Sequence, residues 1–265
     1  MRQTSPEIVT ANLLFMVFWL VLVLIILVAG QYSLAIGSFR ERMISKWKPA
    51  LIIAGLFVLG MGLGESEFFN PYAITVFCQA LKGLGITSNI EGYQPLPVTN
   101  ALVQRRQILR QVILMAVISV LVILPALLIG TIGLDIGQHL FGETNYLREA
   151  ANTMPPNKWL TFFLLLSGSG IVEETPYRLV LLSFIWKVTK RKWLAIVLSA
   201  LVFGAYHLTP LNGMYRIFWQ FPVSQFIAST LIGLVWGYLF IRRGYETTVL
   251  GHTFSNWLPL MVFTG

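Results

Sequence analysis

Residues 111–134 read QVILMAVISVLVILPALLIGTIGL, an apolar stretch that contains no charged side chain. A helix needs roughly 20 apolar residues to cross a hydrocarbon layer about 30 Å thick, and this stretch is long enough. Two further uncharged runs, Ala11–Gly30 and Ile217–Ile241, meet the same requirement. The sequence therefore predicts an integral membrane protein built from α-helices.

The composition extends this prediction to the whole chain of 265 residues. Hydrophobic residues make up 56% and charged residues 11%, whereas a soluble globular domain has about 25% charged residues. Cys78 is the only cysteine, which excludes an intrachain disulfide and a cysteine-based metal site. The predicted fold class is all-α, a polytopic membrane helix bundle that forms one domain over residues 1–265.

Hydropathy places about eight membrane-spanning helices along the chain. The expected spans are 11–30, 49–64, 70–87, 110–133, 159–186, 193–209, 218–241 and 247–263. The first is too long for the apolar region of a signal peptide, so we expect it to be retained. The third is short and contains Pro71. Residues 134–158 are expected to form a surface loop. Gly233 and Gly237 form a G-x-x-x-G pattern, for which packing inside the bundle is favoured over dimerisation.

The positive charges between the spans predict the orientation of the protein. The net charge is +8. Eight spans place four basic clusters on one side, which is then cytoplasmic, with both termini on the non-cytoplasmic side. The clusters are Arg40, Arg42, Lys46 and Lys48; Arg105, Arg106 and Arg110; Lys187, Lys190, Arg191 and Lys192; and Arg242 and Arg243. Positive charge arranged in this way indicates a membrane rather than a nucleic acid as the partner.

Ionisable residues inside a span are costly, by about 2.5–3.5 kcal/mol each, so those that remain are functional candidates. The fifth span contains Glu-Glu-Thr-Pro-Tyr-Arg at 173–178. Glu174 and Arg178 share a helix face and are expected to pair. Glu173 is turned about 100° away, and such an unpaired carboxylate suits a general base. Pro176 cannot donate a backbone hydrogen bond, so we expect a kink or break there. An ion pair that only joins helices explains the motif equally well.

Two later spans also contain polar groups. His207 ends the sequence Phe-Gly-Ala-Tyr-His, and His252 and Asn256 lie four residues apart, so that both project from one helical face. Taken singly, each is more often a structural feature that joins helices. Together, three separate spans bring in a glutamate pair, a histidine, and a histidine with an asparagine. His139 lies in the expected loop and is assigned no role.

The order E-E-x-x-x-R, F-x-x-x-H and H-x-x-x-N resembles the CAAX protease and bacteriocin-processing family of intramembrane endopeptidases, which includes the Ras-converting CAAX endopeptidases. The resemblance covers about residues 159–260. It departs from the family pattern at Tyr177, where phenylalanine is common, and at Leu179, where glycine often follows the arginine. The resemblance implies a CAAX-protease-like catalytic core at 159–263, preceded by variable N-terminal helices at 1–134.

The resemblance also implies a mechanism for hydrolysis of a peptide bond. Glu173 would act as general base on a water molecule that His207 holds and polarises. His252 and Asn256 would donate hydrogen bonds to the oxyanion of the tetrahedral intermediate. A supporting pair, Glu174 and Arg178, would fix the shape of the site.

Zinc is the mechanistic alternative, with Glu173, His207 and His252 as its ligands. The H-E-x-x-H motif of zinc peptidases is absent, and asparagine is a poor zinc ligand. We therefore favour catalysis by glutamate without a cofactor. The expected partners are the membrane lipids and a peptide or protein substrate, for which a lipidated and a membrane-embedded form are the alternatives.

Two functions without proteolysis stay open at this point. A protein of the same fold can serve as a non-catalytic scaffold, regulator or immunity factor. Carboxylates and histidines inside a membrane also serve proton-coupled transporters, although no repeat relates the two halves of this chain.

Helix geometry sets a condition for the site to assemble. At 1.5 Å per residue, His207 lies about 20 Å from the cytoplasmic end of its span, whereas His252 lies about 8 Å and Glu173 about 9 Å from that side. The sixth span must tilt, or begin outside the hydrocarbon, for these residues to meet.

Overall fold

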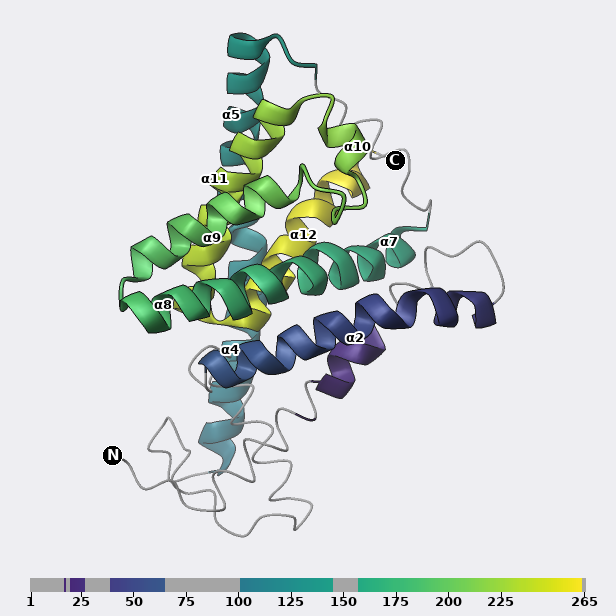
Figure 1. Ribbon diagram of the computed structural model, residues 1–265. Coiled ribbons are helices and arrows are strands. Elements are labelled where there is room, and N and C mark those ends of the chain that lie inside the picture. The colour runs from purple at the N-terminus through teal and green to yellow at the C-terminus, as the bar shows by residue number, and fades with distance from the viewer. Residues whose placement is uncertain (1–16, 18–19, 27–38, 65–100, 145–156, 264–265) are drawn as a thin grey trace.

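The computed structural model describes residues 17, 20–26, 39–64, 101–144 and 157–263, and all regular elements in these residues are helices (Figure 1). The predicted third span, 70–87, and most of the first lie outside the described residues. The all-α fold class is thus confirmed for the part of the chain that the structure describes.

The described elements follow the expected spans closely, except at the ends. They are α2 (Phe39–Gly64), α4 (Ala101–Leu121), α5 (Ile123–Phe141), α7 (Lys158–Leu165), the π-helical segments η3 (Leu166–Glu173) and η4 (Thr175–Leu182), α8 (Ser183–Thr189), α9 (Lys192–Tyr206), α10 (Tyr215–Phe218), α11 (Pro222–Arg243) and α12 (Tyr245–Phe263).

Two of the described helices are long and apolar enough to cross a membrane. One is Ile113–Phe141, which runs through α4 and α5, and the other is α11. Pro49–Met61, within α2, and α9 are shorter apolar helices. The number of crossings, eight, stays a prediction.

The expected loop at 134–158 begins later than predicted. Helix α5 continues past the apolar run to Phe141 and ends at Gly142, whose φ of 68° is the left-handed conformation typical of helix ends. Asp135 and His139 do not interrupt the helix, because both are exposed and lie one turn apart, with 3.2 Å between Oδ1 and Nε2.

Helix α11 packs between α5 and α9. A Cβ atom added to Gly133 of α5 would lie 2.5 Å from Cα of Ala228, so the two backbones are in close contact. On its other side, α11 presents Gly233 and Gly237 to α9, where added Cβ atoms would lie 3.2 Å from Ala200 and 3.1 Å from Ile196. The G-x-x-x-G pattern therefore serves packing inside the bundle, as predicted.

The helix 158–189 is continuous, so of the two outcomes predicted at Pro176, a kink or a break, the break does not occur. Its middle widens into the π-helical segments η3 and η4, with Glu174 between them. A π-helix pairs each backbone N–H with the carbonyl five residues earlier, and such segments are frequent at functional sites. Pro176 has no N–H to contribute, and the Ser183 hydroxyl donates to the Arg178 carbonyl at 3.2 Å. The wider π-helical turns thus accommodate the proline without interrupting the helix.

Helix α2 runs parallel to the long helix formed by α7, η3, η4 and α8 (Figure 1). Gly60 contacts Leu179, and further along both helices the Lys187 Nζ donates to the Leu63 carbonyl at 3.3 Å. Eight alternating spans would place Leu63 and Lys187 on opposite sides, so this part of the predicted layout is wrong.

The other three basic clusters share one end of the molecule. Helices α9 and α11 are antiparallel, which brings residues 187–192 to the end where 242–243 lie. Helices α4 and α12 are parallel, because the Ser119 hydroxyl donates to the Thr247 carbonyl at 3.2 Å and Val122 packs against Gly251. Only the start of α2, with its basic cluster, lies at the other end of the molecule. This cluster therefore no longer supports the side of the membrane predicted for the N-terminus.

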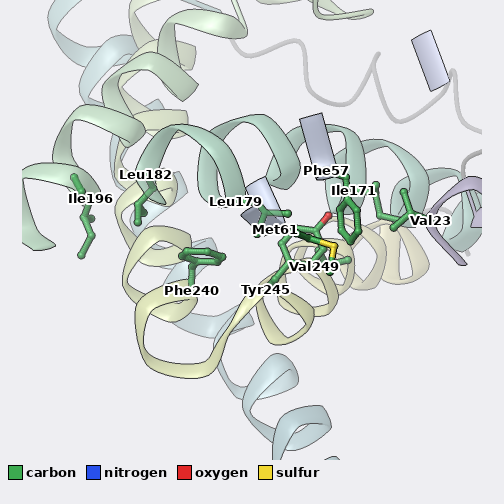
Figure 2. Packing of buried hydrophobic residues seen from close by; sticks show 11 residues of the cluster. Val23, Phe57, Met61, Ile171, Leu179, Leu182, Ile196, Phe240, Tyr245 and Val249 are labelled. Carbon is green, nitrogen blue, oxygen red and sulfur yellow. The ribbon is translucent and has the colours of Figure 1, made fainter. Parts of the chain in front are cut away.

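A hydrophobic core between α2, the long helix and the start of α12 holds the glutamate segment in place (Figure 2). Its buried residues are Val23, Phe57, Met61, Ile171, Leu179, Leu182, Ala195, Ile196, Phe240, Tyr245 and Val249. Ile171 and Leu179 flank residues 173–178 on either side. Their burial fixes the rotation of the helix and therefore the direction of its polar side chains.

Candidate active site

Glu174 and Arg178 form the predicted ion pair, and both side chains are 0% exposed. The Arg178 Nε donates to Oε2 of Glu174 at 3.1 Å. One terminal nitrogen of Arg178 donates to the Ser199 hydroxyl at 2.8 Å, and the guanidinium lies over the Phe203 ring, 4.8 Å from its centroid. The pair therefore anchors the long helix to α9.

The second oxygen of Glu174 binds His252 of α12. Oε1 lies 2.7 Å from the imidazole Nδ1. Because a carboxylate paired with arginine only accepts hydrogen bonds, the Nδ1 atom of His252 carries the proton. Glu174 thus holds the ring of His252 in one orientation, a contact between distant segments that the sequence did not suggest.

Glu173 faces the other nitrogen of the same ring. Its Oε2 lies 3.9 Å from Nε2 of His252, and its side chain is 15% exposed. The His252 ring stacks on Trp236 of α11, with 5.3 Å between centroids and 23° between planes. His252 therefore has one carboxylate at each nitrogen and an indole on its face.

His207 follows the last residue of α9 and is buried. Its Nδ1 lies 2.9 Å from the Phe203 carbonyl, which can only accept, so Nδ1 carries the proton here too. The Phe203 ring contacts both imidazoles, at 4.7 Å from His207 and 5.9 Å from His252. His207 and His252 thus contact the same phenylalanine ring, and Glu173 lies beside His252, so the polar groups of three separate helices are close to one another.

His139 lies apart from this group, whereas Asn256 follows His252 on the same face of α12. Asn256 is half-buried one turn beyond His252 on α12. In the described part of the chain no hydrogen bond joins its amide to Glu173, His207 or His252. His139 pairs with Asp135 on the exposed surface of α5.

Sequence reasoning missed two neighbours of the site. Ser199 accepts from Arg178 and donates to the Tyr177 carbonyl at 2.8 Å. The sequence does contain a pattern that could have indicated Ser199. Ser199, Phe203 and His207 follow one another at intervals of four residues and so share one face of α9. The stacking of Trp236 on His252 depends on how two helices pack, and no pattern along the chain carries it.

The zinc alternative requires three ligands around one point. Among the residues that the structure describes, no three His, Cys, Asp or Glu side chains are placed to hold a metal ion. Zinc therefore stays an alternative to be tested, and the chemistry proposed below is carried by the side chains alone.

Residues 155–258 match a protein family described as Type II CAAX prenyl endopeptidase Rce1-like. The match spans Glu173, Glu174, Arg178, His207, His252 and Asn256. Neither a curated protein nor a solved structure matches the chain. The family consists of membrane-embedded proteases. Residues 155–258 of this chain therefore match the CAAX protease family, as the order of the three polar motifs predicted.

Proposed function

We propose that this protein is a multi-pass intramembrane endopeptidase that hydrolyses a peptide bond with water activated by Glu173. The observation that carries the proposal is the 3.9 Å separation between Glu173 and His252, whose ring is fixed from behind by Glu174. A carboxylate beside an oriented imidazole, in a largely buried place, has the chemistry of a general base.

Glu173 and the Nε2 atom of His207 both accept hydrogen bonds, so together they can bind the two hydrogens of one water molecule. Glu173 takes one proton as the water oxygen bonds to the carbonyl carbon of the substrate. The tetrahedral intermediate then collapses, the C–N bond breaks, and Glu173 returns the proton to the leaving nitrogen. Water is consumed, and a new carboxyl and a new amino terminus result.

The negative charge of the intermediate requires donors near the carbonyl oxygen. The proposed donors are His252 and Asn256. Because Nδ1 of His252 already donates to Glu174, Nε2 can donate only when the ring carries both protons. Glu173 and Glu174 lie one at each nitrogen of this ring, at 3.9 and 2.7 Å.

The proposed substrate is a peptide or protein segment that reaches the site within the membrane. The matching family is described as a CAAX prenyl endopeptidase, so a C-terminal tail carrying a prenyl group on cysteine is one proposed substrate. A membrane-embedded peptide without a lipid is the other.

The proposal is tested with purified protein in liposomes and two probes, a farnesylated peptide with a CAAX terminus and its unlipidated counterpart. After prolonged chelation, wild type should still cleave at least one probe, whereas Glu173→Gln should not. Asp135→Asn is the matched control, because Asp135 is exposed on α5, outside the site. Loss of wild-type cleavage on chelation with recovery on added zinc would overturn the metal-free mechanism. Uptake of a solute that depends on Glu173, without cleavage of membrane peptides, would favour a transporter.

A further inference from the structure

Six exposed basic side chains lie at the end of the molecule where α8 leads into α9 and where α11 ends (Figure 1). Within the ranges that the structure describes, no carboxylate pairs with any of them. Helix α11 is long and apolar enough to cross a membrane, so its basic last turn places these charges at a bilayer surface. The six are Lys187, Lys190, Arg191, Lys192, Arg242 and Arg243.

Two of these cations lie over aromatic rings. The Nζ atom of Lys192 is 4.9 Å from the centroid of Trp186, and the guanidinium of Arg242 is 5.5 Å from that of Tyr238. Tyr238 in turn stacks on Trp193, with 6.0 Å between centroids and 15° between planes. Because Trp193 directly follows Lys192, the two pairs adjoin and form one basic–aromatic patch across α8, α9 and α11. A cation within about 6 Å of a ring centroid is attracted to the ring face, so both charges are held in place on this patch.

The surface beside the patch is apolar. Trp193 is 67% exposed, and Val197 and Leu201 follow it at intervals of four residues on the outer face of α9, where both are also exposed. An ammonium and a guanidinium form strong, charge-assisted hydrogen bonds with phosphate oxygens, whereas an aliphatic helix face packs against hydrocarbon. The patch and the helix face together therefore suit a ligand that has an anionic head and an apolar tail.

We infer that the basic–aromatic patch binds an anionic phospholipid, whose phosphate accepts hydrogen bonds from Lys192 and Arg242 and whose acyl chain lies along the outer face of α9. The inference does not depend on the proposed function. Helix α9 begins at the patch and is 15 residues long, or about 22 Å, and His207 of the candidate active site follows its other end. Lipid binding and peptide hydrolysis are thus separate in space.

Native mass spectrometry of the purified chain in detergent tests the inference. Given an equimolar mixture of phosphatidylglycerol and phosphatidylcholine with the same acyl chains, wild type should bind the anionic lipid at least about tenfold more tightly. Lys192→Gln combined with Arg242→Gln should weaken phosphatidylglycerol binding by about 25-fold, because each cation contributes about fivefold near an anionic headgroup. Tyr238→Leu removes the ring under Arg242 and should weaken binding by about two- to fivefold.

A matched control separates this patch from a general effect of positive charge. Lys158→Gln combined with Arg216→Gln also removes two exposed cations, one of which lies 5.9 Å from the Tyr215 ring, but at the other end of the molecule. This variant should keep the wild-type affinity for phosphatidylglycerol within about twofold, and thermal midpoints check that each variant is folded.

Glycerol 3-phosphate distinguishes a lipid from a soluble phosphate ester, because it has the phosphate but no acyl chain. At equal concentration it should not displace phosphatidylglycerol from wild type. The inference fails if it does, if wild type binds the two lipids equally, or if both double variants lose the same affinity. None of these outcomes bears on Glu173, so the proposed function stands or falls separately.

Discussion

The Nδ1 atom of His252 lies 2.7 Å from Oε1 of Glu174, a contact that joins two segments 78 residues apart in the sequence. Glu174 also binds Arg178 through its other oxygen. The carboxylate therefore does more than shape the site, because it selects which nitrogen of His252 carries the proton and which faces Glu173. Carboxylates behind a functional histidine act in this way in many sites.

The first prediction concerns this contact. In Glu174→Gln the side chain keeps its shape, but it loses its charge and cannot serve as acceptor for both Arg178 and His252. We expect kcat for peptide cleavage to fall by about 10²-fold, comparable to the loss of other groups that orient a functional histidine. Steady-state kinetics on folded protein, with the thermal midpoint as the control, measure the effect. Wild-type kcat in this variant would show that the orientation of His252 does not depend on Glu174.

The second prediction concerns the packing of α5 on α11. Gly133→Ala places a Cβ atom 2.5 Å from Cα of Ala228, and it should destabilise the protein by about 1–3 kcal/mol, as overpacking does. Gly55→Ala in α2 is the matched control, because nothing lies within 4 Å of the added atom. That change should stabilise the helix by about 0.5–1 kcal/mol. Thermal unfolding in detergent compares the two, and equal effects would contradict the close approach of α5 and α11.

The third prediction concerns Glu143, which caps the start of α11. Its carboxylate accepts from the backbone N–H groups of Val223 and Ser224, at 2.9 and 2.7 Å, and from the Ser224 hydroxyl at 2.6 Å. Partial burial raises the pKa of Glu143, but these hydrogen bonds outweigh it and hold the pKa below its ordinary value. The folded state thus has the lower pKa, so the stabilisation is complete above the unfolded pKa of about 4.3 and is lost as pH falls through the folded value.

Thermal midpoints between pH 7 and pH 3 check this expectation. Wild type should exceed Glu143→Gln at pH 7, and the difference should shrink on acidification below about pH 4.3. A difference that stays constant, or grows, as the pH falls would contradict the capping role. Asp135→Asn, an exposed change on the preceding helix α5, is the control in these measurements.

The fourth prediction concerns the direction of α2. With Cys78 replaced by serine, single cysteines are introduced at Ser45, near the start of α2, and at Lys190, after α8. The parallel helices place these positions at opposite ends, so a membrane-impermeant maleimide should label them from opposite faces of sealed vesicles. Labelling from the same face is the result that the eight-span layout would give, and it would contradict the parallel arrangement.

The parts of this molecule that the sequence predicted are those governed by local geometry. Glu174 and Arg178 pair because residues four apart share a helix face, and Gly233 and Gly237 pack inward because only small residues allow helices such close contact. His207 and His252 meet around Phe203, as three polar motifs on separate spans had indicated.

The parts that could not be predicted depend on distant contacts. The bond between Glu174 and His252 arises from the packing of α12 on the long helix, which no spacing in the chain encodes. The π-helical passage through Pro176 was expected as a kink, because the sequence shows the missing N–H but not the pitch that accommodates it. The direction of α2 relative to the long helix depends on how the two helices pack, and the charge pattern alone favoured the opposite direction.

The most direct test of the central claim is hydrolysis in ¹⁸O-labelled water by purified wild type and Glu173→Gln, with a probe peptide that wild type cleaves. If Glu173 activates water, the new carboxyl terminus formed by wild type carries ¹⁸O, and Glu173→Gln forms this product at least about 10³-fold more slowly while its thermal midpoint is unchanged. Labelled product formed by Glu173→Gln at the wild-type rate would contradict the account.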